Sequence, residues 1–235
     1  MKRIMTIVLT VLLTLSLVAC NAGEKPGNPG DTEPQQTDAA MPQETQGTPE
    51  NTGTEKKNMV NYGVDAELTT MDVHVVTDGT SYTIIENTME GLTQFDKDSN
   101  IVPAIAESWD ISPDGLTYTF HIRENAMWSN GEPVTAQDFV YSWRRLVNPE
   151  TASENQFLIA DTSGILNASA IAYEGAAVDT LGVEATDERT LVVTLERPVP
   201  VFLSLLLFPP FYPVNQAFCE THGAMFGQSV EHILA

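Results

Sequence analysis

Basic residues are scarce in this sequence of 235 residues. Lysine and arginine together number 11, against 32 aspartates and glutamates, and the formal net charge is −21 at pH 7. From residue 58 onward, 25 acidic and six basic residues remain, so that part alone carries about −19. Nucleic-acid binding needs a basic surface for the phosphates, and the scarcity therefore argues against such a partner. The acidic excess favours solubility and identifies no ligand.

Motifs that carry catalysis or bind cofactors are also missing. The sequence contains no G-x-x-x-x-G-K-[ST], no G-x-G-x-x-G and no G-x-S-x-G. The histidines show no i, i+4 pairing and lie near no cysteine pair, which argues against zinc. They are His74, His121, His222 and His232. We therefore expect neither an enzyme nor a metal or other cofactor.

Long hydrophobic runs are absent except near the N-terminus. Ile4–Ala19 carries no charge and follows two basic residues, but its sixteen residues are fewer than the roughly 20 that a membrane-spanning helix needs. This pattern is typical of a secretory signal. It ends in Leu-Val-Ala-Cys, which resembles a bacterial lipobox, so we expect cleavage before Cys20 and a diacylglycerol on its thiol. An ordinary signal peptide with a chance cysteine is the alternative.

Residues 21–57 contain no aromatic residue and no Val, Ile or Leu, a composition typical of disorder. We therefore expect a lipoprotein signal peptide at 1–19, a lipidated Cys20 followed by a disordered acidic linker to residue 57, and a folded part at 58–235. The linker would reach on the order of 35 Å. Such reach suits a protein anchored to the outer face of the plasma membrane of a Gram-positive bacterium, without spanning that membrane.

Cysteine is the scarcest residue that could carry chemistry. Only Cys20 and Cys219 are present, so lipidation of Cys20 would leave no disulfide within the chain. No histidine partner for Cys219 is evident. We expect Cys219 to be buried and unreactive rather than a nucleophile.

The hydrophobic pattern predicts the first elements of the folded part. Apolar residues alternate at 59–64, as in a strand. The helical spacing that follows predicts a helix with Thr80 or Ser81 as its N-cap and Gly91 as its stop. Residues 92–103 have the pattern of two strands joined by a polar turn.

Two hairpins are predicted further along the chain. The first spans 107–123 and turns at Pro113-Asp114-Gly115. The second turns at Asp187-Glu188 and places Val183 and Ala185 opposite Leu191, Val193 and Leu195. Between the hairpins, residues 151–179 read as a loop with helical turns. Residues 199–210 predict a short apolar helix that cannot span a membrane.

The stretch from Trp128 to Trp143 predicts a tight turn and then a helix. Asn130-Gly131 supplies the turn, and Thr135 with Asp138 forms a capping box. The following apolar residues share one helical face, and Pro149 ends the helix. They are Phe139, Trp143 and Leu146. We expect both tryptophans to be buried anchors; a stacking platform for a ligand is the alternative.

Several blocks of this sequence, in order, resemble one family. They include EGLTQFDKDSNIVPAIAESW, DGLTYTFHIR, WSNGEPVTAQDFVYSW, LGVEATDERTLVVTLERPVPVFL and FPPFYPVN. This order is similar to the peptide and oligopeptide substrate-binding proteins of ABC importers, and the resemblance covers nearly all of residues 62–235. The stretch between the two tryptophans is part of this family scaffold.

The resemblance implies an α/β fold of the type II periplasmic-binding-protein class, with a mixed sheet, hairpins and packed helices. In the family two lobes close on an extended peptide and deliver it to a membrane permease. The expected partners are therefore an oligopeptide and ABC permease subunits, with the protein itself a monomer. The sequence stops at EHILA, where the family continues into a second lobe. We expect this chain to be a truncated or split product that holds the N-terminal lobe.

The resemblance also implies where this lobe contacts the ligand. In relatives, residues about a dozen before E-G-L pair with the peptide backbone as an added strand. At that spacing lie Thr77, Asp78 and Gly79, and the missing Cβ of Gly79 would let a ligand backbone approach. The alternative is an ordinary polar loop that uses Gly79 to enter the helix. Asn155 departs from the family, since relatives often have an aromatic residue there.

Other functions remain open on the same fold. A nickel, haem or glycan binder, or a sensor of peptide pheromones, would share the same blocks. A lipid-anchored hydrolase or a cell-wall interaction protein lies outside this class.

Overall fold

The structure is a computed structural model that describes residues 63–64 and 66–235. The predicted signal peptide, Cys20, the linker and most of the strand expected at 59–64 lie outside these residues. Of that strand only Gly63 and Val64 are described, and neither belongs to a strand. Within the described ranges, no helix combines the length and the apolar character that crossing a membrane requires.

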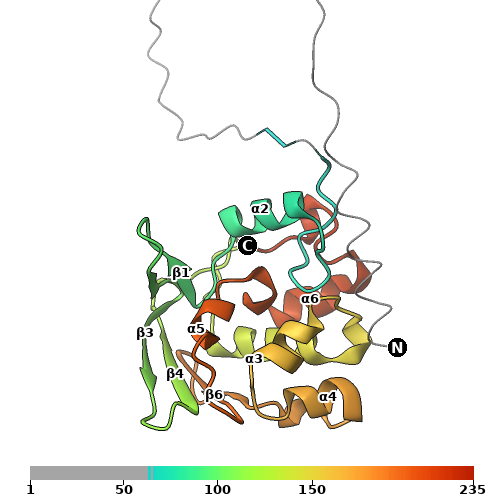
Figure 1. Ribbon diagram of the computed structural model, residues 1–235. Helices are drawn as coiled ribbons and strands as arrows, with labels where there is room; N and C mark the ends of the chain where they lie inside the picture. Colours follow the sequence, from blue (N-terminus) through green and yellow to red (C-terminus); the bar gives the residue numbers. More distant parts are fainter. Residues whose placement is uncertain (1–62, 65) are drawn as a thin grey trace, which may run out of the picture. The chain divides into compact units, whose positions relative to one another are not determined.

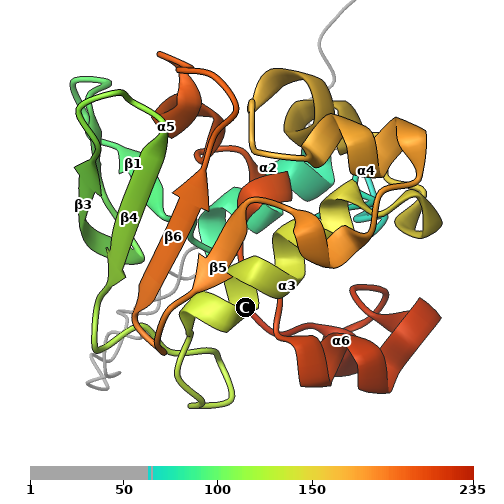
Figure 2. The same ribbon diagram turned by 90° about the horizontal axis from the view of Figure 1, so that it is seen from below.

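The main sheet is antiparallel, and its four strands stand in the order β3-β4-β6-β5 (Figure 2). They are β3 (Ala106–Ile111), β4 (Thr117–Ile122), β5 (Val183–Ala185) and β6 (Thr190–Thr194). The hairpin β3–β4 confirms the first predicted turn, where Gly115 adopts a φ of +70°. Alternate residues of β4 are buried, which matches the period of two in the sequence.

The second hairpin has the register that its sequence predicts. Val183 pairs with Val193, and Ala185 pairs with Leu191. Leu195 lies just beyond β6 and forms an isolated bridge with Ile165 instead of facing β5. A separate two-stranded sheet of β1 (Thr93–Phe95) and β2 (Ile101–Pro103) confirms the strand, turn and strand expected at 92–103.

Helix α3 (Ala136–Val147) packs across the main sheet (Figure 2). It begins as predicted, because the backbone N–H of Thr135 donates to the Asp138 carboxylate at 2.8 Å in a capping box. Its predicted apolar face is fully buried. Trp143 on that face meets Phe211 edge-on, with ring centroids 5.7 Å apart, and donates its indole N–H to the Phe211 carbonyl at 2.9 Å. Trp143 is therefore a core anchor, as expected.

Helix α2 (Gly79–Thr88) lies above this core (Figure 1) and differs from the prediction at both ends. Its N-cap is Asp78, whose carboxylate accepts the backbone N–H of Ser81 at 2.8 Å. Ser81 is buried and accepts the Thr69 N–H instead of capping. The helix ends at Thr88, before Gly91. Gly91 is needed for close packing, because a Cβ there would lie 2.7 Å from the Leu206 carbonyl oxygen.

The remaining helices are short. They are α4 (Ala168–Glu174), α5 (Phe202–Leu205) and α6 (Gln216–His222), with 3-10 turns between them and a π-helical turn at Leu158–Thr162. The apolar helix predicted at 199–210 is thus reduced to the four residues of α5. The mixed segment 151–179 folds into helical turns, as its sequence indicates.

Two clusters of buried apolar side chains hold these elements together. The larger one lies between the main sheet and α3. The smaller one lies under α2 and is formed by Met71, Val73, Val76, Ile85, Tyr212, Val214, Cys219 and Phe226. The smaller cluster therefore joins the segment before α2 to the segment around α6.

Candidate functional site

Within the described residues, the backbone at the start of α2 presents an unpaired edge. Thr77 and Gly79 are exposed. Among the described residues, no hydrogen bond uses the N–H or C=O of Thr77 or the N–H of Gly79. Between them, the Asp78 carbonyl accepts the Tyr82 N–H at 3.1 Å and so belongs to the helix. Alternate residues of an extended chain face the same way, so Thr77 and Gly79 offer two donors and one acceptor along one edge.

The side chain of Asp78 serves the fold. Its carboxylate accepts hydrogen bonds from the Ser81 N–H and from the Thr69 hydroxyl. The bond from Thr69, followed by those from Ser81, lowers the pKa of Asp78 to about 2. Its role as a helix cap accounts for this aspartate without any ligand. Because the Asp78 side chain is occupied, only the main-chain groups of this segment can bind a ligand. This agrees with the expected pairing of the segment with a peptide backbone.

Gly79 is not required by the fold around it. It has no positive φ, and an added Cβ would meet nothing within 4 Å. The glycines at 115 and 91 differ, since a turn and a close approach require them. Open space beside Gly79 is compatible with a second backbone lying against this edge.

A buried polar network fixes the segment that leads to this edge. Asp72 accepts two hydrogen bonds from the Arg145 guanidinium of α3, at 2.6 and 2.8 Å. The Asp72 side chain is 5% exposed and that of Arg145 is 19% exposed. The Asp72 carboxylate also accepts the His74 N–H at 3.0 Å. Paired charges with further hydrogen bonds are the form in which buried ions are tolerated.

His74 is a neutral member of the network. Its Nε2 lies 3.1 Å from the Ser142 hydroxyl, which itself donates to the Tyr212 carbonyl at 2.6 Å. The hydroxyl hydrogen is therefore used, so Nε2–H donates and Nδ1 accepts from Arg145 at 2.6 Å. Complete burial, and then the charge of Arg145, lower the pKa of His74 to about 3. The imidazole stays uncharged at neutral pH.

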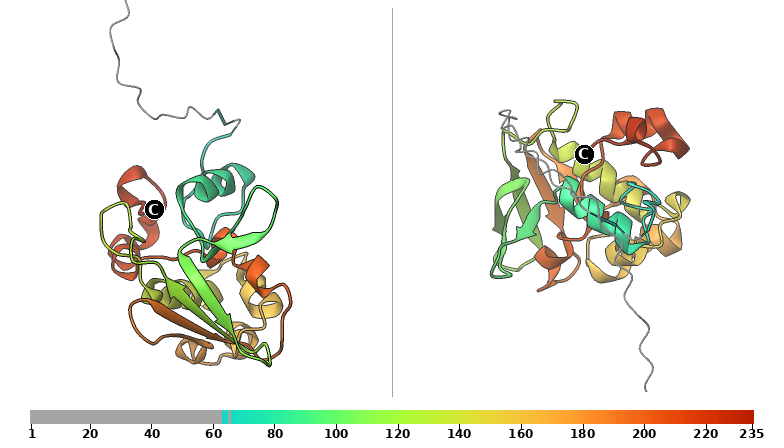
Figure 3. Two further views of the ribbon diagram at one scale, coloured as in Figure 1. Left: turned by 90° about the vertical axis from the view of Figure 1, so that its left-hand side faces the viewer. Right: turned by 90° about the horizontal axis from the view of Figure 1, so that it is seen from above.

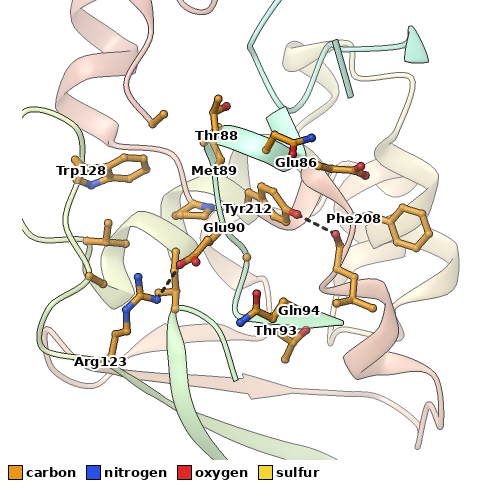
Figure 4. Close-up of a pocket in the computed structure, with 18 of the residues that line it drawn as sticks. Glu86, Thr88, Met89, Glu90, Thr93, Gln94, Arg123, Trp128, Phe208 and Tyr212 are labelled. Carbon is orange, nitrogen blue, oxygen red and sulfur yellow. Dashed lines mark hydrogen bonds and ion pairs between the residues drawn. The ribbon is translucent and has the colours of Figure 1, made fainter. Parts of the chain in front are cut away.

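A second feature is a cleft of about 870 Å³ at the other end of α2 (Figure 4). It is lined by the end of α2 and β1, by parts of 123–134 and 204–213, and by Ala235. In both views of Figure 3 the C-terminus lies near α2. None of Thr77, Asp78 and Gly79 lines it. Glu86 is the first residue of α2 that lines the cleft, and about 10 Å of helix separates it from Gly79.

The walls of the cleft are largely apolar. Trp128, Phe208 and Tyr212 contribute rings to it (Figure 4). Its cation, Arg123, is already engaged by Glu90 at 2.9 Å and by the Ala104 carbonyl at 2.7 Å. Polar side chains also line it, among them Glu86, Thr93 and Gln94, and this combination suits an amphipathic occupant.

Trp128 confirms one prediction and adds to it. Its side chain is 4% exposed, and its indole N–H lies 3.4 Å from the Asp138 carboxylate, as expected for a buried anchor. The same ring forms part of the cleft wall. The local sequence could not predict that Trp128 lines a cleft, because the other residues of the cleft come from distant segments of the chain.

In the part of the chain that the structure describes, metal-ligating side chains do not gather at one place. No three side chains of His, Cys, Asp or Glu are placed there to hold a metal ion. Cys219 is 5% exposed, and burial raises the pKa of its thiol. The predicted burial of Cys219 is thus confirmed, and a raised thiol pKa disfavours the reactive thiolate.

Residues that the sequence did not single out support the edge from behind. Arg145 lies in the helix predicted after Thr135, and Tyr82 lies in the helix predicted before Gly91, but no sequence pattern distinguishes either residue. Asn155 was noted only as a departure from the resembling family. Arg145 and Asn155 lie 71 and 79 residues away from their partners His74 and Val76, and Tyr82 lies 73 residues away from its partner Asn155. No local pattern announces such pairs.

Comparison with known proteins identifies the context of these features. Residues 100–228 match the middle region of bacterial extracellular solute-binding proteins, family 5. A dipeptide-binding protein of Lactococcus lactis is 40% identical over 175 residues, which cover 74% of this chain and 31% of the relative. A probable deoxycholate-binding periplasmic protein of Escherichia coli is 40% identical over 185 residues, or 79% of this chain and 34% of the relative.

Solved structures give the same result. The substrate-binding domain of an oligopeptide ABC transporter from Bacillus anthracis superposes with a TM-score of 0.68 at 44% identity, covering 72% of this chain and 32% of that one. Peptide-bound OppA of Listeria monocytogenes gives 0.67 at 38% identity, with 70% and 32% covered. The fold is therefore the expected type II binding-protein class. This chain spans about a third of the length of these relatives.

Proposed function

Because this chain belongs to the bacterial extracellular solute-binding proteins of family 5, we propose that it captures oligopeptides outside the cytoplasmic membrane for delivery to an ABC permease. Proteins of this family bind solutes rather than catalyse reactions. The observation that carries the proposal is the unpaired backbone edge at Thr77 and Gly79. An edge of main-chain donors and acceptors recognises any peptide in the same way, whatever its side chains.

The structural role of each part follows from this proposal. The Thr77–Gly79 edge contributes one wall of the peptide site, and the buried pair of Asp72 and Arg145 keeps that wall rigid. Rigid walls matter because ordering a loop on binding would cost affinity. One wall leaves half of the peptide in water, so this lobe alone binds weakly.

The membrane attachment is proposed on sequence alone. Cys20 follows an uncharged run of sixteen residues and precedes the polar linker of 21–57. We assign the signal peptide to 1–19, the lipidated cysteine and linker to 20–57, and the binding lobe to 58–235. The protein then works as a monomer tethered by lipid on the outer face of the membrane.

The apolar cleft supports a second candidate ligand class. Its rings from Trp128, Phe208 and Tyr212 suit a rigid amphipathic molecule, and one relative is named for deoxycholate. The two ligand classes predict different places on the protein. A peptide would contact Thr77 and Gly79, whereas a bile acid would contact the cleft beyond the other end of α2.

Backbone amide shifts measured by NMR during titration separate these candidates. We expect trialanine at millimolar concentration to shift the amides of Thr77 and Gly79, and deoxycholate to leave them unchanged. Calorimetry should detect no micromolar or tighter peptide binding to this lobe. Shifts confined to the cleft, with deoxycholate but with no peptide, would favour the second ligand class and overturn the proposal.

A further inference from the structure

The carbonyl of Val76 is held by two side chains. Asn155 donates its side-chain N–H to this carbonyl oxygen at 3.0 Å, and the Tyr82 hydroxyl lies 3.2 Å from the same oxygen. The hydroxyl is also 3.1 Å from Asn155 Oδ1, and its one hydrogen is shared between these two acceptors, so the three groups form a closed set. Val76 itself is fully buried, and its N–H donates to the Asp72 carbonyl at 3.1 Å. Both sides of Val76 are therefore fixed.

Fixing this carbonyl also fixes the next amide. The C=O of Val76 and the N–H of Thr77 belong to one planar trans peptide unit, in which they point in opposite directions. A carbonyl drawn inward by Asn155 and Tyr82 thus directs the Thr77 N–H outward. That N–H is the first donor of the unpaired edge, and Thr77 is exposed.

The loop that carries Asn155 is itself anchored to the same segment. The Ser153 hydroxyl donates to the carbonyl of His74, and the Asn155 N–H donates to the Ser153 hydroxyl at 3.1 Å. A π-helical turn, a rare element that is often found at functional sites, begins three residues later at Leu158. Asn155 is therefore placed by backbone contacts on both sides.

We propose that Asn155 is a positioning residue for peptide binding: with Tyr82, it orients the Thr77 N–H as a donor to the ligand backbone. This inference rests on the proposed function and extends it to residues that touch no ligand. It assigns Asn155, where the resembling family often has an aromatic residue, a role through the backbone rather than through stacking. Because the effect passes through a main-chain donor, it is the same for every peptide sequence.

The test replaces one amide by the carboxylate of the same shape. Asn155→Asp keeps an acceptor for Tyr82 but removes the donor to Val76. The matched control is Gln156→Glu, which makes the same change in charge one residue away, where Gln156 donates to the Val147 carbonyl at 2.8 Å. Both variants and the parent chain are titrated with trialanine and with trivaline, and the amide signals are followed by NMR.

We expect Asn155→Asp to shift the Thr77 amide signal in the free protein. Its dissociation constants for both tripeptides should rise by roughly five- to tenfold, the loss that one hydrogen bond of ordinary strength represents. Gln156→Glu should leave both unchanged. Tyr82→Phe, which keeps Asn155 and removes only the hydroxyl, should give a smaller loss in the same direction and serves if Asn155→Asp does not fold.

Three results would overturn the inference, and only one of them would also reject the proposed function. Equal affinity of Asn155→Asp and the parent, with the Thr77 signal unchanged, removes only the positioning role. A similar loss in Asn155→Asp and Gln156→Glu, accompanied by reduced stability, assigns Asn155 to loop stability alone. Absence of peptide binding by the parent chain removes the proposed function together with this inference.

Discussion

Arg145 of α3 holds Asp72 through both carboxylate oxygens, across 73 residues of sequence. The same guanidinium lies 5.6 Å above the ring of Phe226 and contacts His74 Nδ1. One cation thus ties the segment before α2 to α3 and to the C-terminal region. This arrangement explains why an exposed backbone edge at Thr77 can be rigid although few residues support it locally.

Removing one partner of this pair should destabilise the fold strongly. Arg145→Met leaves the Asp72 carboxylate buried without its counter-charge, and we expect a loss of about 3–5 kcal/mol in the free energy of unfolding. Urea unfolding followed by circular dichroism measures this. The control is Lys97→Ala, which breaks the fully solvated pair with Asp98 and should cost under about 1 kcal/mol. Similar costs for the two variants would contradict this account.

Stability should fall with acid because of His74. Its pKa is about 3 in the folded protein, against an ordinary pKa of 6.5 for an exposed histidine, so the unfolded chain takes up the proton first as the pH falls. The contribution of His74 is fully present above pH 6.5 and is lost toward pH 3, by about 1.4 kcal/mol per pH unit.

The variant His74→Gln isolates this effect. Between pH 6 and pH 4, its unfolding free energy should depend less steeply on pH than that of the parent. Burial raises the pKa of Asp138, so protonation of Asp138 stabilises the folded protein as the pH falls. This contribution is the same in the parent and the variant and cancels when their pH dependences are compared. Parallel pH dependences of the two proteins would show that His74 is not kept neutral by burial.

Trp143 should matter for stability and not for binding. Trp143→Ala opens a cavity in the main core and removes the donor to the Phe211 carbonyl, at an expected cost of about 3–5 kcal/mol. Thermal unfolding measures this, with Phe208→Ala, at a ring that is 51% exposed, as the mild control. Unchanged stability of Trp143→Ala with loss of ligand binding would instead favour the stacking platform.

Gly79→Pro should weaken peptide binding without unfolding the protein. Gly79 is the first residue of α2, where proline is favoured, and Asp78 has the extended backbone that a following proline needs, with φ −105° and ψ 148°. The substitution removes the Gly79 N–H. Affinity for trialanine, measured by NMR titration, should fall strongly, whereas Asp78→Ala should lower the melting temperature and change affinity little. If the Gly79→Pro variant is folded and binds trialanine as tightly as the parent, the Thr77–Gly79 edge is not part of the peptide site.

Cys20→Ser should release the protein from the membrane. Cys20 is the attachment that the sequence offers, and serine cannot accept the thioether-linked lipid. Fractionation of cells followed by immunoblotting should find the variant in the soluble fraction, or in an unprocessed form. A processed variant that is fully retained in the membrane would require another anchor.

The sequence alone determined the elements whose hydrogen bonds and packing are local. The turn at Gly115, the capping box of Thr135 and Asp138, and the pairing of Val183 with Val193 all join residues that lie within ten positions of each other. Their period and turn chemistry are readable without the fold. Where two local signals competed, as at the start of α2, the sequence failed: Asp78 takes the cap, and Ser81 turns inward toward Thr69.

Only the tertiary structure decided the rest. The pairing of β4 with β6, the pair of Asp72 and Arg145 and the bond from Asn155 to Val76 join positions separated by about 70 residues or more. Nothing in the local pattern selects such partners, because their contact energy exists only once the two segments are packed. The candidate edge depends on both sources. The resemblance to a family points to Thr77–Gly79, whereas the contacts of Asn155 with Val76 and Tyr82 exist only in the folded chain.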